Sequence, residues 1–303
     1  MQKKTTAYHY HAKDIPVAFA LGLLWLITRL PYRWQLSIGC GVGLSVYHLA
    51  KRRRKIASIN IDLCFPEKTA EQRALLVKQH FSSLGMGLIE IALAWWASDK
   101  KLARLGKIEG LSYLEQALAQ GKGVILLSAH LNSMELGLRY LTQQQKIHIT
   151  YRPHEHPLIE HHMQKSRNFH AEKAIPREGI RDMIRSLKSN KPLWFAADQN
   201  FGHKGSVFAN FFNILAATNT SASRLSKLCG SPVIPFLVQR LPDGKGYQVR
   251  LLPPLANFPS GDRVADATTM NNMIETAVTQ TPEQYLWVHR RFKDRPQGEA
   301  RFY

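Results

Sequence analysis

Short apolar runs and amphipathic stretches alternate along most of the chain, a pattern that predicts a mixed α/β architecture. Apolar and β-branched runs bounded by turn residues predict strands at 124–128, 147–151, 193–197, 233–238, 247–252 and 285–288. Apolar residues at helical spacing predict helices at 112–120, 133–143, 157–167, 179–187, 220–229 and 266–279. We therefore expect one domain over 51–303, a mixed sheet flanked by helices on both faces.

A longer helix is expected before this region. Thr69, Ala70, Glu71 and Gln72 form a capping box that begins a helical stretch reaching Trp96. The second half of this stretch, from 81 to 97, contains a single charged residue, Glu90. Such a helix packs in a core or faces lipid, and a core position is the commoner reason for an apolar stripe.

Two apolar segments open the chain. Residues 15–28 are uncharged but fall short of the ~20 residues that span a bilayer. Residues 34–50 are weakly polar and are followed by five cations at 51–55, which favour contact with anionic headgroups on the cytoplasmic side of a membrane. The alternative is a soluble amphipathic pair with a solvated basic turn. Because no signal-peptidase site follows, we interpret 1–50 as an uncleaved anchor with a transmembrane helix, although its length leaves a full crossing open.

The net charge limits the classes of molecule that the protein is expected to bind. The chain has 41 Lys and Arg against 22 Asp and Glu, a formal charge of +19, and such a field attracts nucleic acid, anionic lipid or an acidic protein. No RNA-binding signature, zinc-finger spacing or basic heptad is present, so no nucleic-acid partner is expected. Cys40, Cys64 and Cys229 form no paired motif, which fits a reducing compartment. The histidines at 154, 156, 161 and 162 lack metal-site spacing, so no metal is expected.

A candidate acid–base pair follows the strand at 124–128. His130 comes just after this strand, and Glu135 lies five positions further on. A neutral imidazole can take a proton from an alcohol at cellular pH, and a carboxylate on its other nitrogen would fix its tautomer. Since residues five apart do not share a helix face, we expect His130 in the turn and Glu135 in the next helix. The alternative is a strand-end histidine with one satisfied hydrogen bond and a solvated glutamate.

Other polar residues lie at positions suited to ligands. Asp198 ends the apolar strand at 193–197, where it could serve a site or cap a loop. Arg167, in the helix at 157–167, could stabilise an oxyanion or a phosphate, or be a solvated surface residue. Arg290 and Arg291, in the basic run after the last apolar segment, could bind a phosphorylated headgroup or form a solvated tail.

Taken together, these segments resemble the late acyltransferases of lipid A biosynthesis, the lauroyl-type enzymes that act on Kdo-lipid IVA. This family is a branch of the lysophospholipid and glycerolipid acyltransferase superfamily. The resemblance extends over nearly the whole chain, through blocks at 63–67, 85–88, 130–135, 151–153, 157–159, 194–198, 206–208, 242–248 and 282–293. The wider superfamily usually has Asp where this chain has Glu135, so Glu135 fits the lipid A branch.

The resemblance implies an inner-membrane enzyme whose active site faces the cytoplasm. It implies acyl-acyl carrier protein as donor, the hydroxyl of a hydroxyacyl chain on Kdo-lipid IVA as acceptor, and no cofactor. We expect His130 to deprotonate that hydroxyl, Glu135 to support the imidazolium, Arg167 to offset developing charge, and Asp198 to position a basic partner or the substrate. The expected catalytic residues are His130 and Glu135, and the expected substrate-binding residues are Arg167, Asp198, Arg152, Arg290 and Arg291. The alternatives are another acceptor, such as a lysophospholipid, or a membrane lipid-binding protein without turnover.

Overall fold

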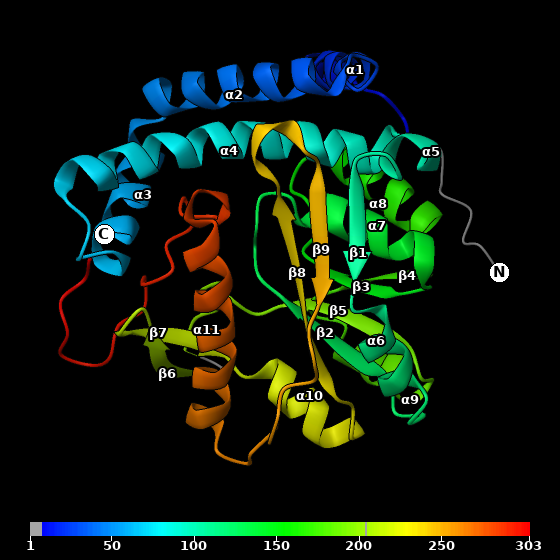
Figure 1. The fold of residues 1–303 in the computed structure, drawn as a ribbon, viewed down its shortest axis with the longest axis vertical. Helices are drawn as coiled ribbons and strands as arrows, with labels where there is room; N and C mark the ends of the chain where they lie inside the picture. The colour runs from blue at the N-terminus through cyan, green and yellow to red at the C-terminus, as the bar shows by residue number, and fades with distance from the viewer. Residues whose placement is uncertain (1–7, 204) are drawn as a thin grey trace.

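The computed structural model describes residues 8–203 and 205–303 of the 303-residue chain. Its main sheet has seven strands in the order β1-β9-β8-β2-β5-β3-β4, and β6 and β7 form a separate antiparallel pair (Figure 1). The strands are β1 (Gly106–Glu109), β2 (Val124–Ser128), β3 (His148–Tyr151), β4 (Lys173–Pro176), β5 (Pro192–Ala196), β6 (Ser206–Phe211), β7 (Ile214–Asn219), β8 (Val233–Arg240) and β9 (Tyr247–Leu251).

The α-helices cover this sheet and extend above it (Figure 1). They are α1 (Ile15–Ile27), α2 (Tyr32–Leu49), α3 (Lys51–Cys64), α4 (Ala70–Trp96), α5 (Asp99–Leu102), α6 (Leu111–Leu118), α7 (Met134–Gln144), α8 (Pro157–His170), α9 (Ile180–Lys188), α10 (Ser221–Cys229) and α11 (Arg263–Gln280). Three short 3₁₀ turns lie at Ala12–Asp14, Pro242–Gly244 and Pro282–Gln284.

The main sheet is mixed, as predicted. Strands β8, β2, β5, β3 and β4 run in one direction, whereas β9 is antiparallel to β8 and pairs in parallel with β1. Strand β2 lies between β8 and β5, and all five of its residues are buried. A continuous apolar run is what a parallel strand covered on both faces requires.

The prediction that helices cover both faces of the sheet is confirmed. The side chains of β2 point alternately into two core clusters. Val124 and Leu126 belong to a core cluster that includes residues of α4, α6 and α7. Ile125 and Leu127 point the other way, into a cluster with residues of α9, α10 and α11. Because successive side chains of a strand alternate between its faces, the two clusters lie on opposite sides of the sheet.

The predicted strand at 285–288 is wrong. The structure has only an isolated bridge there, between Leu131 and Tyr285. Trp287 is fully buried, and its indole N–H donates to the Pro282 carbonyl at 2.6 Å, which holds the segment in a compact turn. The apolar pattern at 285–288 correctly indicated buried side chains. These side chains pack in an aromatic cluster and do not pair with a neighbouring strand.

Helices α1 and α2 form a layer over α4 (Figure 1). Glycines allow α2 and α4 to approach closely: a Cβ atom at Gly43 would lie 2.0 Å from the Phe81 carbonyl oxygen, and one at Gly85 would lie 2.4 Å from the Gly43 nitrogen. None of the described helices combines the length and the apolar character needed to cross a bilayer, so the expected transmembrane helix is not found among them. Residues 1–7 of the predicted anchor lie outside the described residues, and the boundary at 50 stays a prediction.

The single charge in the apolar half of α4 has a buried partner. Arg240 of β8 donates to Glu90 at 2.6 Å and also to the Ser83 hydroxyl. Both side chains of the ion pair are almost fully buried. Removing one partner of such a pair leaves an uncompensated charge, so the pair fixes α4 relative to the sheet.

Candidate active site

The site begins where two neighbouring parallel strands end. Ser128 of β2 is in register with Ala196 of β5, so His130 and Asp198, each two residues further on, come face to face. The backbone N–H of His130 donates to Asp198 Oδ2 at 3.0 Å, and His130 Nδ1 lies 2.6 Å from Asp198 Oδ1. Asp198 therefore holds both the main chain and the ring of His130.

The charge of Asp198 follows from this contact. Its side chain is only 2% exposed, and burial alone would raise its pKa, but the charge and hydrogen bonds of His130 lower that pKa to about 2. An ionised carboxylate at Nδ1 favours the tautomer that has its proton there and leaves Nε2 as an acceptor. The His130 side chain is 22% exposed and lines a cavity, so a ligand can reach the ring.

Glu135 has a different partner from the one expected. It lies in the first turn of α7 and forms a bidentate pair with Arg167, in the last turn of α8, at 3.0 and 2.6 Å. The expected support of the His130 ring by Glu135 is thus corrected, because strand register places Asp198 beside the ring whereas α7 directs Glu135 toward α8. In the described part of the chain, Asp198 is the carboxylate that contacts the imidazole.

Arg167 is buried, with its charge maintained by Glu135. Burial alone would lower the pKa of the guanidinium, but Glu135 raises that pKa above its ordinary value. The guanidinium also lies over the Tyr151 ring, 5.3 Å from its centroid. Its Nη1 is buried and has no acceptor among the described residues. Because buried donors are normally paired, this unpaired nitrogen distinguishes Arg167 among the polar groups next to the site.

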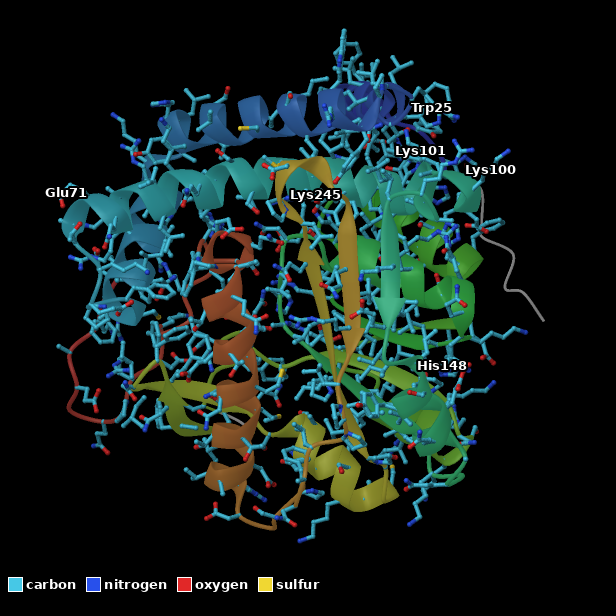
Figure 2. All side chains as sticks on the ribbon, viewed as in Figure 1. Trp25, Glu71, Lys100, Lys101, His148 and Lys245 are labelled. Carbon is cyan, nitrogen blue, oxygen red and sulfur yellow. The ribbon has the colours of Figure 1, made fainter. Side chains whose placement is uncertain are left out.

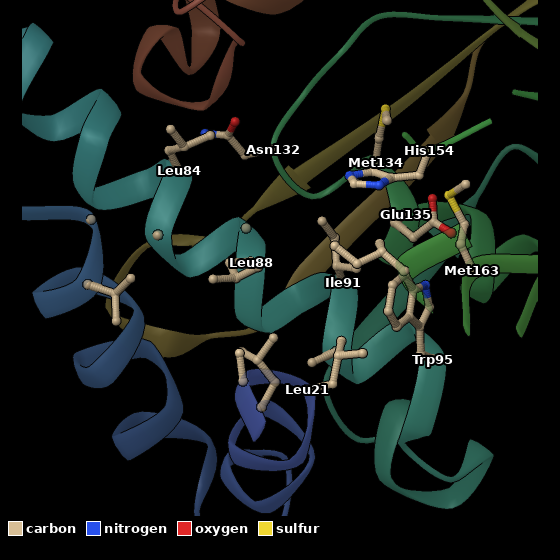
Figure 3. A pocket seen from close by; sticks show the side chains of 18 of the residues that line it. Leu21, Leu84, Leu88, Ile91, Trp95, Asn132, Met134, Glu135, His154 and Met163 are labelled. Atoms are coloured by element: carbon tan, nitrogen blue, oxygen red, sulfur yellow. The ribbon is translucent and has the colours of Figure 1, made fainter. Parts of the chain in front are cut away.

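A cavity of about 830 Å³ adjoins these polar groups. One wall is a stripe of α4 formed by Leu84, Leu88, Ile91 and Trp95, with α1 on one side and Glu135, His154 and Met163 across from it (Figure 3). At 1.5 Å per residue, this stripe extends over about 16 Å. One leaflet of a bilayer core is about 15 Å thick, so the cavity matches the length of a fatty acyl chain.

The loop that carries His130 is held by the C-terminal segment. The Leu286 N–H donates to the His130 carbonyl at 3.1 Å, and the Asn132 N–H donates to the Gln284 carbonyl at 2.8 Å. The Asn132 side chain donates to Ser83 of α4 at 3.0 Å. Much of the 282–293 block therefore supports the site mechanically.

The remaining predicted residues have partners other than His130 and Glu135. Arg152 is exposed and pairs with Glu155 at 3.0 Å. Arg290 lies over the Tyr303 ring, 5.8 Å from its centroid. Arg291 is buried and donates to the Ala217 carbonyl at 2.7 Å and to the Thr218 hydroxyl at 2.9 Å. Its position argues against the expected headgroup contact, because protein acceptors already bind it in the core.

Sequence reasoning missed His289 and most of the cavity wall. His289 Nε2 accepts the Asn200 N–H at 3.1 Å, and burial lowers its pKa to about 4, so it is neutral near Asp198. The available signal was a histidine beside the predicted arginines at 290 and 291. No group of three potential metal ligands is found within the described residues.

Comparisons with known proteins identify a family. The model of the bacterial lipid A biosynthesis acyltransferase family matches residues 2–294. The chain is 38% identical over 279 residues to the lipid A biosynthesis lauroyltransferase of Escherichia coli strain K12, covering 92% of this chain and 91% of that protein. It is also 38% identical over 286 residues to the palmitoleoyltransferase of the same strain, covering 94% and 93%. The myristoyltransferase of that strain is 26% identical over 281 residues, covering 91% and 86%.

Proposed function

Because the chain belongs to the bacterial lipid A biosynthesis acyltransferase family, we propose a specific donor and acceptor for the acyl transfer that it performs in that pathway. The donor is acyl-acyl carrier protein carrying laurate or a chain of similar length. The acceptor is the hydroxyl of a hydroxyacyl chain on Kdo-lipid IVA. The observation that supports this most directly is the His130–Asp198 pair beside an apolar cavity as long as a fatty chain.

In the proposed mechanism, His130 is the general base. Its Nε2 takes the proton of the acceptor hydroxyl as that oxygen attacks the thioester carbonyl carbon. A C–O bond forms, the C–S bond to the carrier protein breaks, and the proton on His130 passes to the departing thiolate. Asp198 stabilises the imidazolium while the proton resides there.

The Glu135–Arg167 pair provides a fixed positive charge at the cavity wall. The positive charge of Arg167, which lines the cavity, is suited to the oxyanion that forms on the thioester carbonyl, or to a polar group of the acceptor next to it. Glu135 acts by holding the guanidinium in place, so we assign it a positioning role instead of direct support of the base.

The proposal also includes the attraction of both substrates to the positive chain and the location of the enzyme in the cell. An acidic carrier protein and a phosphorylated acceptor are both attracted by a chain of formal charge +19, and the exposed Arg152 and partly exposed Arg290 are available to their acidic groups. We place the enzyme at the inner membrane with the site on the cytoplasmic side, where carrier-bound donor is present.

The proposal is tested by presenting the purified, detergent-solubilised chain with lauroyl-acyl carrier protein and one acceptor at a time. We expect mass spectrometry to show an added lauroyl group on Kdo-lipid IVA and none on lysophosphatidate. Preferential acylation of the lysophospholipid would replace the proposed acceptor. Binding of either lipid without any product would contradict catalysis.

We expect the α4 stripe to limit the length of the transferred chain. Ile91→Trp adds bulk to the cavity wall, so the ratio of lauroyl to octanoyl transfer should fall by about tenfold or more, since each methylene in a hydrophobic pocket is worth ~1–3 kcal/mol. Competition between the two carrier-bound donors measures this ratio. Leu75→Trp, an exposed position of α4 that does not line the cavity, is the matched control and should leave the ratio unchanged.

A further inference from the structure

The outer side of α1 carries an exposed apolar stripe. Ile15, Phe19, Leu23 and Leu26 follow one another at intervals of four, four and three residues and are 45–67% exposed. This spacing places them on one face of the helix. The opposite face is apolar as well, since Val17, Leu21 and Leu24 line the cavity. A helix that is apolar on both sides lacks the polar face that water requires.

The outer side of α2 continues this surface. Trp34 and Leu49, near its two ends, are 65% and 82% exposed. The two serines on this side satisfy their hydroxyls within the helix: Ser37 donates to the Arg33 carbonyl at 3.1 Å and Ser45 to the Gly41 carbonyl at 3.0 Å. Such hydroxyls can enter apolar surroundings without leaving an unpaired donor.

The charges that these two helices and the segment after them carry are all of one sign. No Asp or Glu occurs from 15 to 61, whereas Arg29 and Arg33 flank the junction of α1 and α2 and the cationic run 51–55 follows α2. Arg29 lies over the Trp25 ring, 4.5 Å from its centroid. Tryptophan and arginine together are typical of the headgroup level of a membrane. A second copy of the chain would bring like charges together, because a two-fold contact pairs the same patch with itself.

The two helices lie across α4 as a single layer, with the sheet on the far side of α4 (Figure 1). Trp25 lies at the α1 end of this layer, whereas His148 lies well below it among the strands (Figure 2). From this arrangement we propose that the outer face of α1 and α2 docks on an anionic phospholipid leaflet, with both helices lying in the plane of the membrane. The inference refines the membrane location given in the proposed function.

This orientation has a consequence for the substrate. The inner faces of the same two helices line the acyl-chain cavity through Leu21, Leu24, Val42 and Val46. The layer therefore separates the cavity from the leaflet by the thickness of one helix. In the proposed orientation, the cavity that His130 lines is therefore close to the leaflet that holds the acceptor lipid.

The depth of α1 in the membrane tests the orientation. Spin labels are attached to single cysteines at 15, 19, 23 and 26 of the full chain, with the three native cysteines replaced by alanine, on phosphatidylglycerol-containing vesicles. Labels in an in-plane helix report one shallow depth, about 5–10 Å below the headgroup boundary. A depth that increases steadily from 15 to 26 would overturn the proposal, as would four labels accessible only to water.

A second measurement tests the surface itself by vesicle flotation. Phe19→Glu with Leu23→Glu should weaken binding about tenfold or more, because two exposed apolar side chains lose their lipid contact. Leu228→Glu, at an exposed site on α10, is the matched control and should bind like the parent chain. Unchanged binding of the double variant, with loss of a dimer in sedimentation, would assign the surface to self-association instead. Flotation requires no turnover, so failed docking and failed acyl transfer are separable.

Discussion

Replacing His130 by alanine is expected to lower kcat for acyl transfer by about 10³-fold or more, since a positioned general base contributes ~10²–10⁴ and the attacking alcohol is otherwise unreactive at neutral pH. Single-turnover assays with carrier-bound laurate, read by mass spectrometry, measure this loss. The side chain is partly exposed, so the fold should persist, and circular dichroism and thermal unfolding serve as controls. Transfer at the parental rate by the folded variant would eliminate His130 as the base.

The second variant, Asp198→Asn, keeps the imidazole of His130 but removes the carboxylate that orients it. It therefore tests whether the orientation of the ring matters for catalysis. Asp198 uses one oxygen for the backbone N–H of His130 and the other for Nδ1, and an amide has only one oxygen to offer. An Asn amide group donating to Nδ1 would stabilise the wrong tautomer, so we expect a loss approaching that of His130→Ala, about 10³-fold. A loss below tenfold in a folded variant would show that Asp198 is not needed to orient the ring.

The contact between Asp198 and His130 should also make the stability of the fold depend on pH in a defined direction. The pKa of Asp198 is lowered from its ordinary 3.8 to about 2, so the ionised Asp198 carboxylate contributes stability that is present above pH 3.8 and is lost as the pH falls toward 2. Asp198→Asn should remove this part of the acid dependence. Unfolding curves of the two proteins between these pH values provide the comparison.

The types of the site residues could be predicted from the sequence, but their pairing could not. His130 and Asp198 each follow an apolar strand, and such positions are where α/β sheets place functional groups. That they touch depends on β2 and β5 being neighbours in register, a long-range fact invisible in either segment. Closeness in sequence made Glu135 the apparent partner of His130, whereas the register selected Asp198.

For the fold as well, local features could be predicted from the sequence and long-range contacts could not. Strand β2 was readable because all its residues are buried, whereas β1 and β4 have only four residues each, most of them not fully buried, and so left little pattern. In the segment around Trp287, apolar and aromatic residues indicated a strand, yet contacts with distant elements hold it in a turn. Local pattern therefore predicted burial better than it predicted which partner would provide it.

Breaking the Glu135–Arg167 pair is expected to have a large effect on stability. Arg167→Met leaves the largely buried Glu135 side chain, 11% exposed, without its charge partner, and breaking a buried ion pair typically costs ~3–5 kcal/mol of unfolding free energy. Denaturant unfolding, combined with the acyl transfer assay, measures both consequences. Glu135→Leu alone should have a similar cost, because it leaves the buried guanidinium uncompensated.

The double variant Glu135→Leu with Arg167→Met decides what the pair is for. Replacing both charges by apolar side chains removes the uncompensated charge, so most of the lost unfolding free energy should return. Acyl transfer should stay about 10²-fold or more below the parent chain, because the cavity then lacks the cation proposed to stabilise the oxyanion. If stability and transfer returned together, the pair would be structural, and Arg167 would have no role at the reacting carbonyl.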